Sequence, residues 1–294
     1  MNNKNNQLLN AKSGGFAFSA LMCVYMFVNF IGQSICIGLF PDGGKAFTAI
    51  CSCFSIISII IVAFAVANKT KSGFSIVQAK KFNCKYLLFA VLLSGGMFFG
   101  LGFLNNFFIS LLEKLGLSVG GASVSLESVG DLILFIFLLA VLPAVFEEIF
   151  FRGVMVSALK NASVVATVVA VACCFALYHC SCSQLLYQAV YGAGLTLLLI
   201  CSGSVIPCIV AHFINNFAVL VLTYLQVEID FLNPLCISFG LLMLGAFFTL
   251  TILCVKKQKT TSANKAEVYN FWLPFGAFGC LICLAVLISS LFVG

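Results

Sequence analysis

Long apolar runs are the feature that most limits what this chain can fold into. Nine mostly apolar stretches, each about 20 residues long or longer, are separated by short polar breaks. A helix of about 20 residues crosses the hydrocarbon core of a bilayer, whereas transmembrane β-strands are about 10 residues long and alternate apolar with polar side chains. Only 8% of the residues are charged and the mean hydropathy is +1.17, which is more apolar surface than a soluble domain can bury. The sequence therefore predicts an all-α, polytopic transmembrane helical bundle.

The expected spans follow directly from these runs. They are residues 16–40, 46–67, 86–111, 131–158, 163–181, 184–201, 205–226, 232–255 and 271–293. Their number falls from nine to eight if 184–201, which is short and contains glycine, is irregular. Because the spans use most of the chain, we expect a single membrane domain over residues 1–294, without a large soluble part.

Lysine residues gather in alternate loops between the expected spans. The N-terminal segment and one set of loops hold Lys4, Lys12, Lys69, Lys71, Lys80, Lys81, Lys85, Lys160, Lys256, Lys257, Lys259 and Lys265. The opposite loops hold Asp42, Glu113, Glu127, Glu228 and Asp230, with Lys45 and Lys114. Since cytoplasmic loops carry an excess of basic residues, we expect a multi-pass protein of the plasma (cytoplasmic) membrane with a cytoplasmic N-terminus. The net charge of +6 then reflects topology, and we expect the lipid bilayer as a partner and no nucleic acid.

The scarce ionisable residues within the apolar runs are candidates for function. Arg152 is the single arginine of the chain and His179 and His212 are its two histidines, and all three lie in expected spans or at their ends. Ionisable side chains at membrane depth face a bundle interior or a cavity and mark functional sites. Lysine supplies the topogenic charge elsewhere in the chain. We therefore expect the arginine to be present because its guanidinium can bind a carboxylate in a bidentate manner.

The stretch FEEIFFRG, residues 146–153, places two carboxylates beside this arginine. On a helix, Glu148 and Arg152 are four residues apart on one face, in the order that stabilises an ion pair. Glu147 is rotated by about 100° and is free for another partner. Two carboxylates in different environments suit acid–base chemistry, although a structural ion pair alone would also explain the charges. Pro143 is expected to kink the helix beside them.

Two further polar groups follow in the next spans. His179 ends the stretch FALYH, and a histidine in that position is often a satisfied structural group. His212 and Asn216 lie four residues apart on one helical face, as an oxyanion-binding pair requires. Alternatively, Asn215 or Asn216 joins neighbouring helices by a hydrogen bond. Counting from the turn near residues 161–163, Glu147 and His179 reach similar depths, whereas on straight helices His212 would lie one or two turns closer to the cytoplasm.

Taken in order, these residues resemble the motifs of the CPBP family, the CAAX proteases and bacteriocin-processing enzymes, also called the Abi family. The motifs are E-E-x-x-x-R, F-x-x-x-H and H-x-x-x-N. The matching residues are Glu147, Glu148 and Arg152, then Phe175 and His179, then His212 and Asn216. The resemblance covers a core of residues 131–226, whereas 1–130 and 227–294 hold additional transmembrane helices without recognised motifs.

The resemblance implies an intramembrane glutamic endopeptidase, similar to the type II CAAX prenyl endopeptidase, that cleaves a lipidated or hydrophobic peptide. Glu147 would activate water with the help of His179. His212 and Asn216 would stabilise the oxyanion, and Glu148, Arg152 and Phe175 would support the site. No cofactor is expected, although Glu147, His179 and His212 could alternatively bind zinc.

Two other functions remain as alternatives. A non-catalytic bacteriocin self-immunity protein would keep the fold without the reaction. A transporter is the third hypothesis, but the charges cluster in one third of the chain and the hydropathy shows no inverted repeat. The sequence does not distinguish prenyl-dependent cleavage from the processing of a leader peptide.

Overall fold

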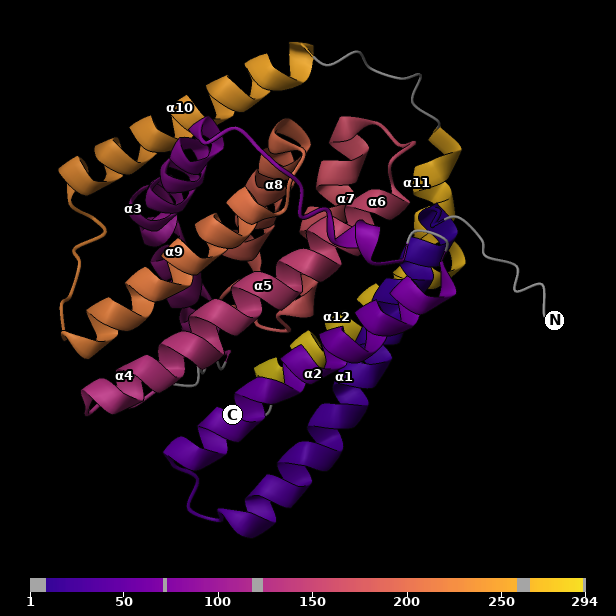
Figure 1. Cartoon of the computed structure of the whole chain (residues 1–294). Helices are drawn as coiled ribbons and strands as arrows, with labels where there is room; N and C mark the ends of the chain where they lie inside the picture. The colour runs from indigo at the N-terminus through magenta and orange to yellow at the C-terminus, as the bar shows by residue number, and fades with distance from the viewer. Residues whose placement is uncertain (1–8, 71–72, 118–123, 258–264, 293–294) are drawn as a thin grey trace.

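The computed structural model describes residues 9–70, 73–117, 124–257 and 265–292, and these contain helices but no β-strand. The helices, drawn in Figure 1, are α1 (Ala11–Leu39), α2 (Lys45–Lys69), α3 (Lys85–Lys114), α4 (Val129–Phe135), α5 (Leu142–Glu148), α6 (Val156–Ala158), α7 (Val164–Tyr178), α8 (Leu185–Ser202), α9 (Ile206–Tyr224), α10 (Pro234–Lys257), α11 (Lys265–Phe271) and α12 (Ala277–Phe292). A 3₁₀ turn, η1 (Gly73–Val77), precedes α3. The predicted all-α bundle is confirmed.

Eight helical segments of the described chain are long and apolar enough to cross a membrane. They agree with the predicted spans within a few residues at most ends. The expected span 184–201 is regular and forms the 18-residue helix α8, so the alternative in which it is irregular is wrong. The shorter helix is instead α7, whose 15 residues run from Val164 to Tyr178. At about 1.5 Å per residue, α7 is about 22 Å long, less than the thickness of the hydrocarbon core.

Residues 129–158 form one long composite helix. Two π-helical turns, Ile136–Val141 and Ile149–Met155, separate α4, α5 and α6. Its start is set by Ser128, whose side chain accepts a hydrogen bond from the backbone N–H of Asp131 while the Asp131 carboxylate accepts from that of Ser128. This capping box satisfies two backbone donors that a helix start leaves without partners. Pro143 lies in the first turn of α5, directly after the first π-helical turn.

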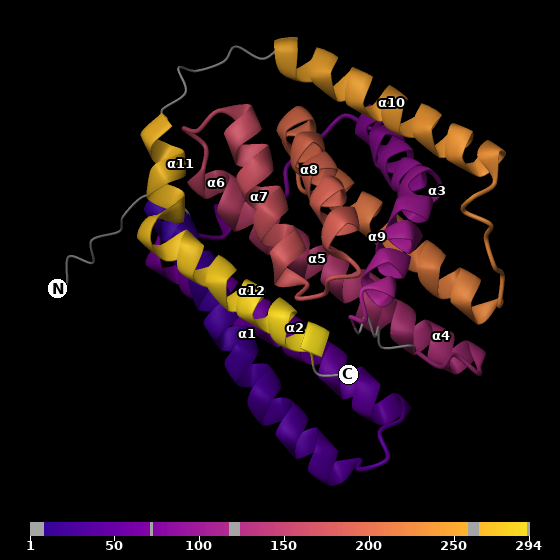
Figure 2. The ribbon, with the colours of Figure 1, turned by 180° about the vertical axis from the view of Figure 1, so that it is seen from behind.

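The composite helix lies between two groups of helices (Figures 1 and 2). On one side, α1, α2, α7 and α12 bury apolar side chains against its second half. On the other side, α3, α8, α9 and α10 share a second core, and α5 itself contacts α2 and α9. A Cβ atom on Gly240 of α10 would lie 2.0 Å from the backbone nitrogen of Gly100 in α3. Glycine at both positions therefore permits the close approach of these helices, as is typical of membrane bundles.

Candidate active site

A buried ion pair joins Glu148 to Arg152, as their helical spacing predicts. Nη1 of Arg152 donates to Oε1 of Glu148 at 2.9 Å, and both side chains are fully buried. Nη2 donates to the backbone carbonyl of Gly192 in α8 at 3.2 Å, and the guanidinium lies 4.4 Å from the ring centre of Phe175 in α7. A planar guanidinium can make all three contacts at once, whereas a lysine ammonium cannot. Arg152 therefore connects the composite helix to α7 and α8.

Glu148 also binds His212 of α9. Nδ1 of His212 lies 2.9 Å from the same Oε1 atom that accepts from Arg152. Because an ionised carboxylate only accepts hydrogen bonds, Nδ1 carries a hydrogen, and in the neutral ring the lone pair is on Nε2. The bond thus fixes both the orientation and the tautomer of this histidine.

Glu147 is outside this network and faces both histidines. Its Oε2 atom is 4.0 Å from Nε2 of His179 and 4.0 Å from Nε2 of His212, and the residue is 6% exposed. Nδ1 of His179 lies 2.8 Å from the carbonyl oxygen of Phe175, which also only accepts, so its neutral ring likewise presents the Nε2 lone pair. The same carboxylate oxygen of Glu147 therefore faces the Nε2 atoms of both histidines.

His212 and Glu147 lie close together, although straight helices would place them at different depths. His212 is the seventh of the 19 residues of α9, whereas His179 directly follows the last residue of α7. Figures 1 and 2 show the composite helix running obliquely to α7, and α5 packs against α9. Residues at different distances from their helix ends therefore meet at the site.

Asn216 lies one turn beyond His212, and its amide is bonded to the composite helix. Nδ2 donates to the carbonyl oxygen of Leu139 at 3.0 Å. Leu139 is four residues before Pro143, which has no N–H to donate to that carbonyl in an α-helix. The bond joins two helices, as predicted by the alternative in which Asn215 or Asn216 links neighbouring helices. It leaves the second hydrogen of Nδ2 for another acceptor. Asn215 accepts a hydrogen bond from the hydroxyl of Tyr187 at 2.6 Å.

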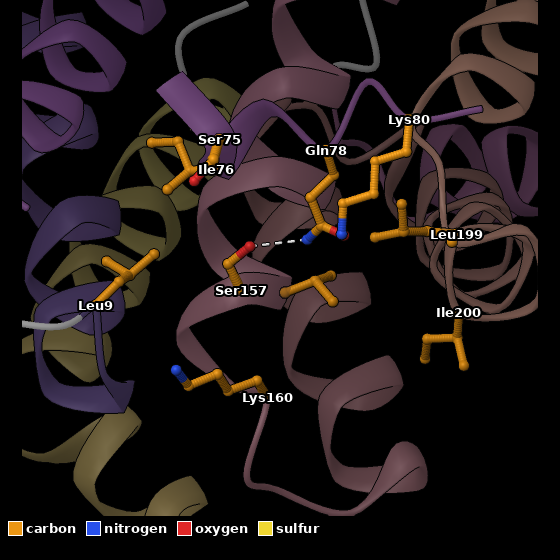
Figure 3. Close-up of a pocket in the computed structure, with 11 residues that line it drawn as sticks. Leu9, Ser75, Ile76, Gln78, Lys80, Ser157, Lys160, Leu199 and Ile200 are labelled. Carbon is orange, nitrogen blue, oxygen red and sulfur yellow. Dashed lines mark hydrogen bonds between the residues drawn. The ribbon is translucent and has the colours of Figure 1, made fainter. Parts of the chain in front are cut away.

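Some contributors to the site were not anticipated from the sequence. Nε2 of Gln78, in the lysine-rich loop, donates to Oγ of Ser157 at 2.7 Å, and it lies 3.5 Å from the carbonyl oxygen of Arg152. Figure 3 shows this bond in the wall of a cavity of about 510 Å³. A Cβ atom on Gly153 would lie 2.7 Å from the carbonyl oxygen of Ile76, so glycine here makes room for η1. In the sequence, Gly153 directly after Arg152 could have indicated this close contact. Nothing in the sequence distinguishes Gln78 from other polar loop residues.

The zinc alternative was tested against the arrangement of the candidate ligands. Glu147, His179 and His212 supply the donor types of a catalytic zinc site, but the carboxylate oxygen is 4.0 Å from each imidazole nitrogen. Ligand atoms that share one zinc ion at about 2.0–2.1 Å in tetrahedral geometry lie about 3.3 Å apart. Within the part of the chain that the structure describes, no group of three or more His, Cys, Asp or Glu side chains is arranged for metal binding.

The fold and these contacts define a multi-pass helical membrane protein with a buried site of two carboxylates, two imidazoles and one guanidinium. Comparison with protein families identifies the domain that carries this site: residues 129–218 match the family model described as type II CAAX prenyl endopeptidase Rce1-like. The match begins with α4 and includes every candidate site residue. No curated protein and no solved structure matches the chain. The family supports a CAAX-type membrane protease, consistent with the resemblance of the three motifs.

Proposed function

We propose that this protein is an intramembrane glutamic endopeptidase in which Glu147 activates the attacking water. The observation that carries the proposal is the position of Glu147 Oε2, 4.0 Å from two imidazole Nε2 atoms whose rings are each fixed through Nδ1. A water molecule at a normal hydrogen-bond distance of about 2.8 Å could donate to Glu147 and to one of the histidines. Its lone pair would then point away from these acceptors, towards a substrate carbonyl.

The reaction needs only a transfer of protons among these groups. The water gives one proton to Glu147 while its oxygen attacks the carbonyl carbon of the scissile peptide bond. Collapse of the tetrahedral intermediate breaks the C–N bond, and the leaving amine takes the proton from Glu147. We assign the assisting role to His179, which orients the water. His212 would stabilise the oxyanion as an imidazolium, which already carries hydrogens on both Nδ1 and Nε2 before the water attacks, together with the second N–H of Asn216.

Glu148 and Arg152 support this chemistry without reacting. Their charges neutralise each other within a fully buried network, so Glu147 is the carboxylate that remains available to a substrate. Phe175 contributes its carbonyl to His179 and its ring to Arg152. A preorganised site of this kind stabilises charge that develops during the reaction more effectively than water can.

The substrate proposed is a hydrophobic or lipidated peptide associated with the bilayer. The site lies within a helix long enough to span the membrane, so a substrate must reach it within or at the edge of the lipid. Both CAAX-type cleavage and the processing of a leader or bacteriocin peptide meet this requirement. We further propose the plasma membrane as the location, with the N-terminus and the lysine-rich loops in the cytoplasm.

Purified protein in liposomes tests the catalytic assignment. A farnesylated CAAX-type reporter peptide and an acyl-anchored leader-type peptide would be incubated with the wild type and with Glu147→Gln and His179→Ala variants. We expect both substitutions to reduce kcat by at least a hundredfold, within the range for loss of an acid–base group. Glu113→Gln, at an exposed position near the end of α3, is the matched control and should leave kcat unchanged.

Persistent cleavage by both variants would show that Glu147 and His179 do not catalyse the reaction. Cells provide a second readout, because a self-immunity protein without catalysis would still protect against a bacteriocin when it carries Glu147→Gln. Protection by this variant would favour the non-catalytic alternative over the protease.

A further inference from the structure

A second cavity adjoins the site and is lined by neutral polar groups. It has a volume of about 640 Å³. Its polar lining consists of Asn105, Asn106, Gln184, Tyr187, Gln188, Asn215, Asn216 and Thr223. Its apolar lining consists of Phe98, Gly102, Val124, Leu139, Val219, Leu220 and Phe231. Within the described part of its wall, no residue carries a charge.

One residue of the proposed site, Asn216, lies in the wall of this cavity. Asn216 is one turn from His212 on α9, and Leu139 is about two turns from Glu147 on the composite helix. The hydrogen bond between Asn216 and Leu139 joins the two helices at this boundary. A chain whose scissile bond lies beside Glu147 would therefore extend along this wall.

The polar lining has hydrogen-bonding capacity that its own contacts do not use. Oε1 of Gln188 is buried and has no hydrogen-bond partner in the described structure, while Nε2 of the same residue lies 3.4 Å from Oε1 of Gln184. A buried acceptor without a donor is unfavourable, and a donor from a bound molecule would satisfy it. The primary amides of Asn105 and Asn106 in the same lining carry N–H donors. The cavity therefore offers both an acceptor and a donor to an occupant.

We propose that this cavity binds an extended, uncharged, internal segment of the peptide substrate, next to the bond that is cleaved. This inference rests on the proposed protease function and specifies its substrate. Main-chain N–H and C=O groups need acceptors and donors in alternation, which primary amides provide together. The apolar part of the wall, including Phe98, Leu220 and Phe231, accepts small or apolar side chains.

The same lining excludes two kinds of occupant. A charged side chain would give up part of its hydration without gaining an ion pair from the described lining, which is unfavourable. A free C-terminal carboxylate is normally bound by arginine or lysine, and no described lining residue is basic. The bound segment is therefore internal, with the end of the substrate beyond the cavity.

A binding experiment tests this inference separately from catalysis. The inactive Glu147→Gln variant in liposomes would be titrated with fluorescent acyl-anchored peptides of uncharged residues, ending in either a free carboxylate or an amide. We expect equal affinity for the two ends. Addition of Asn105→Leu and Gln188→Leu should weaken binding at least tenfold, whereas Gln33→Leu, on exposed α1 away from the cavity, should not change it.

Charge exchange gives a gain-of-function readout that misfolding cannot imitate. A peptide with one lysine beside the scissile bond should bind at least tenfold more weakly than its uncharged parent, and Gln188→Glu should restore its binding. Unchanged affinity in the double leucine variant, failure of this rescue, or a clear preference for the free carboxylate would overturn the inference. If peptides bind in the cavity but the wild type cleaves none of them, the proposed protease function fails while the binding site remains.

Discussion

Removal of the Arg152 guanidinium should destabilise the fold, because it leaves the buried carboxylate of Glu148 without its charged partner. Arg152→Met deletes the donor at 2.9 Å from Glu148 and the donor at 3.2 Å from the carbonyl of Gly192. Both charged side chains are fully buried, so water cannot replace the lost partner. Breaking such a pair costs about 3–5 kcal/mol, and we expect a loss of this size in the free energy of unfolding. Arg152→Lys keeps the charge but not the fork of donors, so it should fall between wild type and methionine.

Reversible unfolding in mixed micelles measures this loss, with SDS as the denaturant and the fluorescence of Trp272 as the signal. The double variant Glu148→Gln, Arg152→Met leaves neither partner of this pair charged, so it should recover about 2 kcal/mol relative to the sum of the single losses. Glu127→Gln removes one partner of an ion pair with Lys45 in which both side chains are at least 36% exposed, and should change stability by less than about 1 kcal/mol. A loss below about 1 kcal/mol for Arg152→Met, or strict additivity in the double variant, would refute the argument from a buried network.

Three further outcomes are expected. Gly240→Ala should destabilise the protein by about 1–3 kcal/mol in the same unfolding assay, because its Cβ would collide with Gly100, whereas Gly245→Ala, with no atom within 4 Å of its Cβ, should be tolerated. Asn216→Leu leaves the carbonyl of Leu139 without this donor, so it should cost about 1–3 kcal/mol in stability; in the liposome cleavage assay it should lower kcat more than it changes KM. Dialysis against a metal chelator should leave the cleavage rate unchanged, and a loss that zinc restores would assign the site to a metal instead.

Much of the architecture follows from patterns that are local in the chain. Runs of about 20 apolar residues can satisfy their backbone in a bilayer only as helices, so the fold class and most helix ends were predictable. The spacing of Glu148 and Arg152 likewise determines that one carboxylate is paired and Glu147 is not, since a helix turns by about 100° per residue. The main error concerned α7 and α8, because composition indicates an apolar helix but does not determine where its last turn ends.

Other parts of the site depend on how the helices are placed against one another. The chain order of Glu147, His179 and His212 does not reveal that both imidazoles lie 4.0 Å from one carboxylate oxygen, since this depends on how the composite helix packs against α7 and α9. The bond from Asn216 to Leu139 likewise arises only when two helices meet. Helical periodicity determines which side chains share a face, and the sequence by itself specifies that much. Tilt and depth result from packing over the whole bundle, so only the tertiary structure brings these faces together.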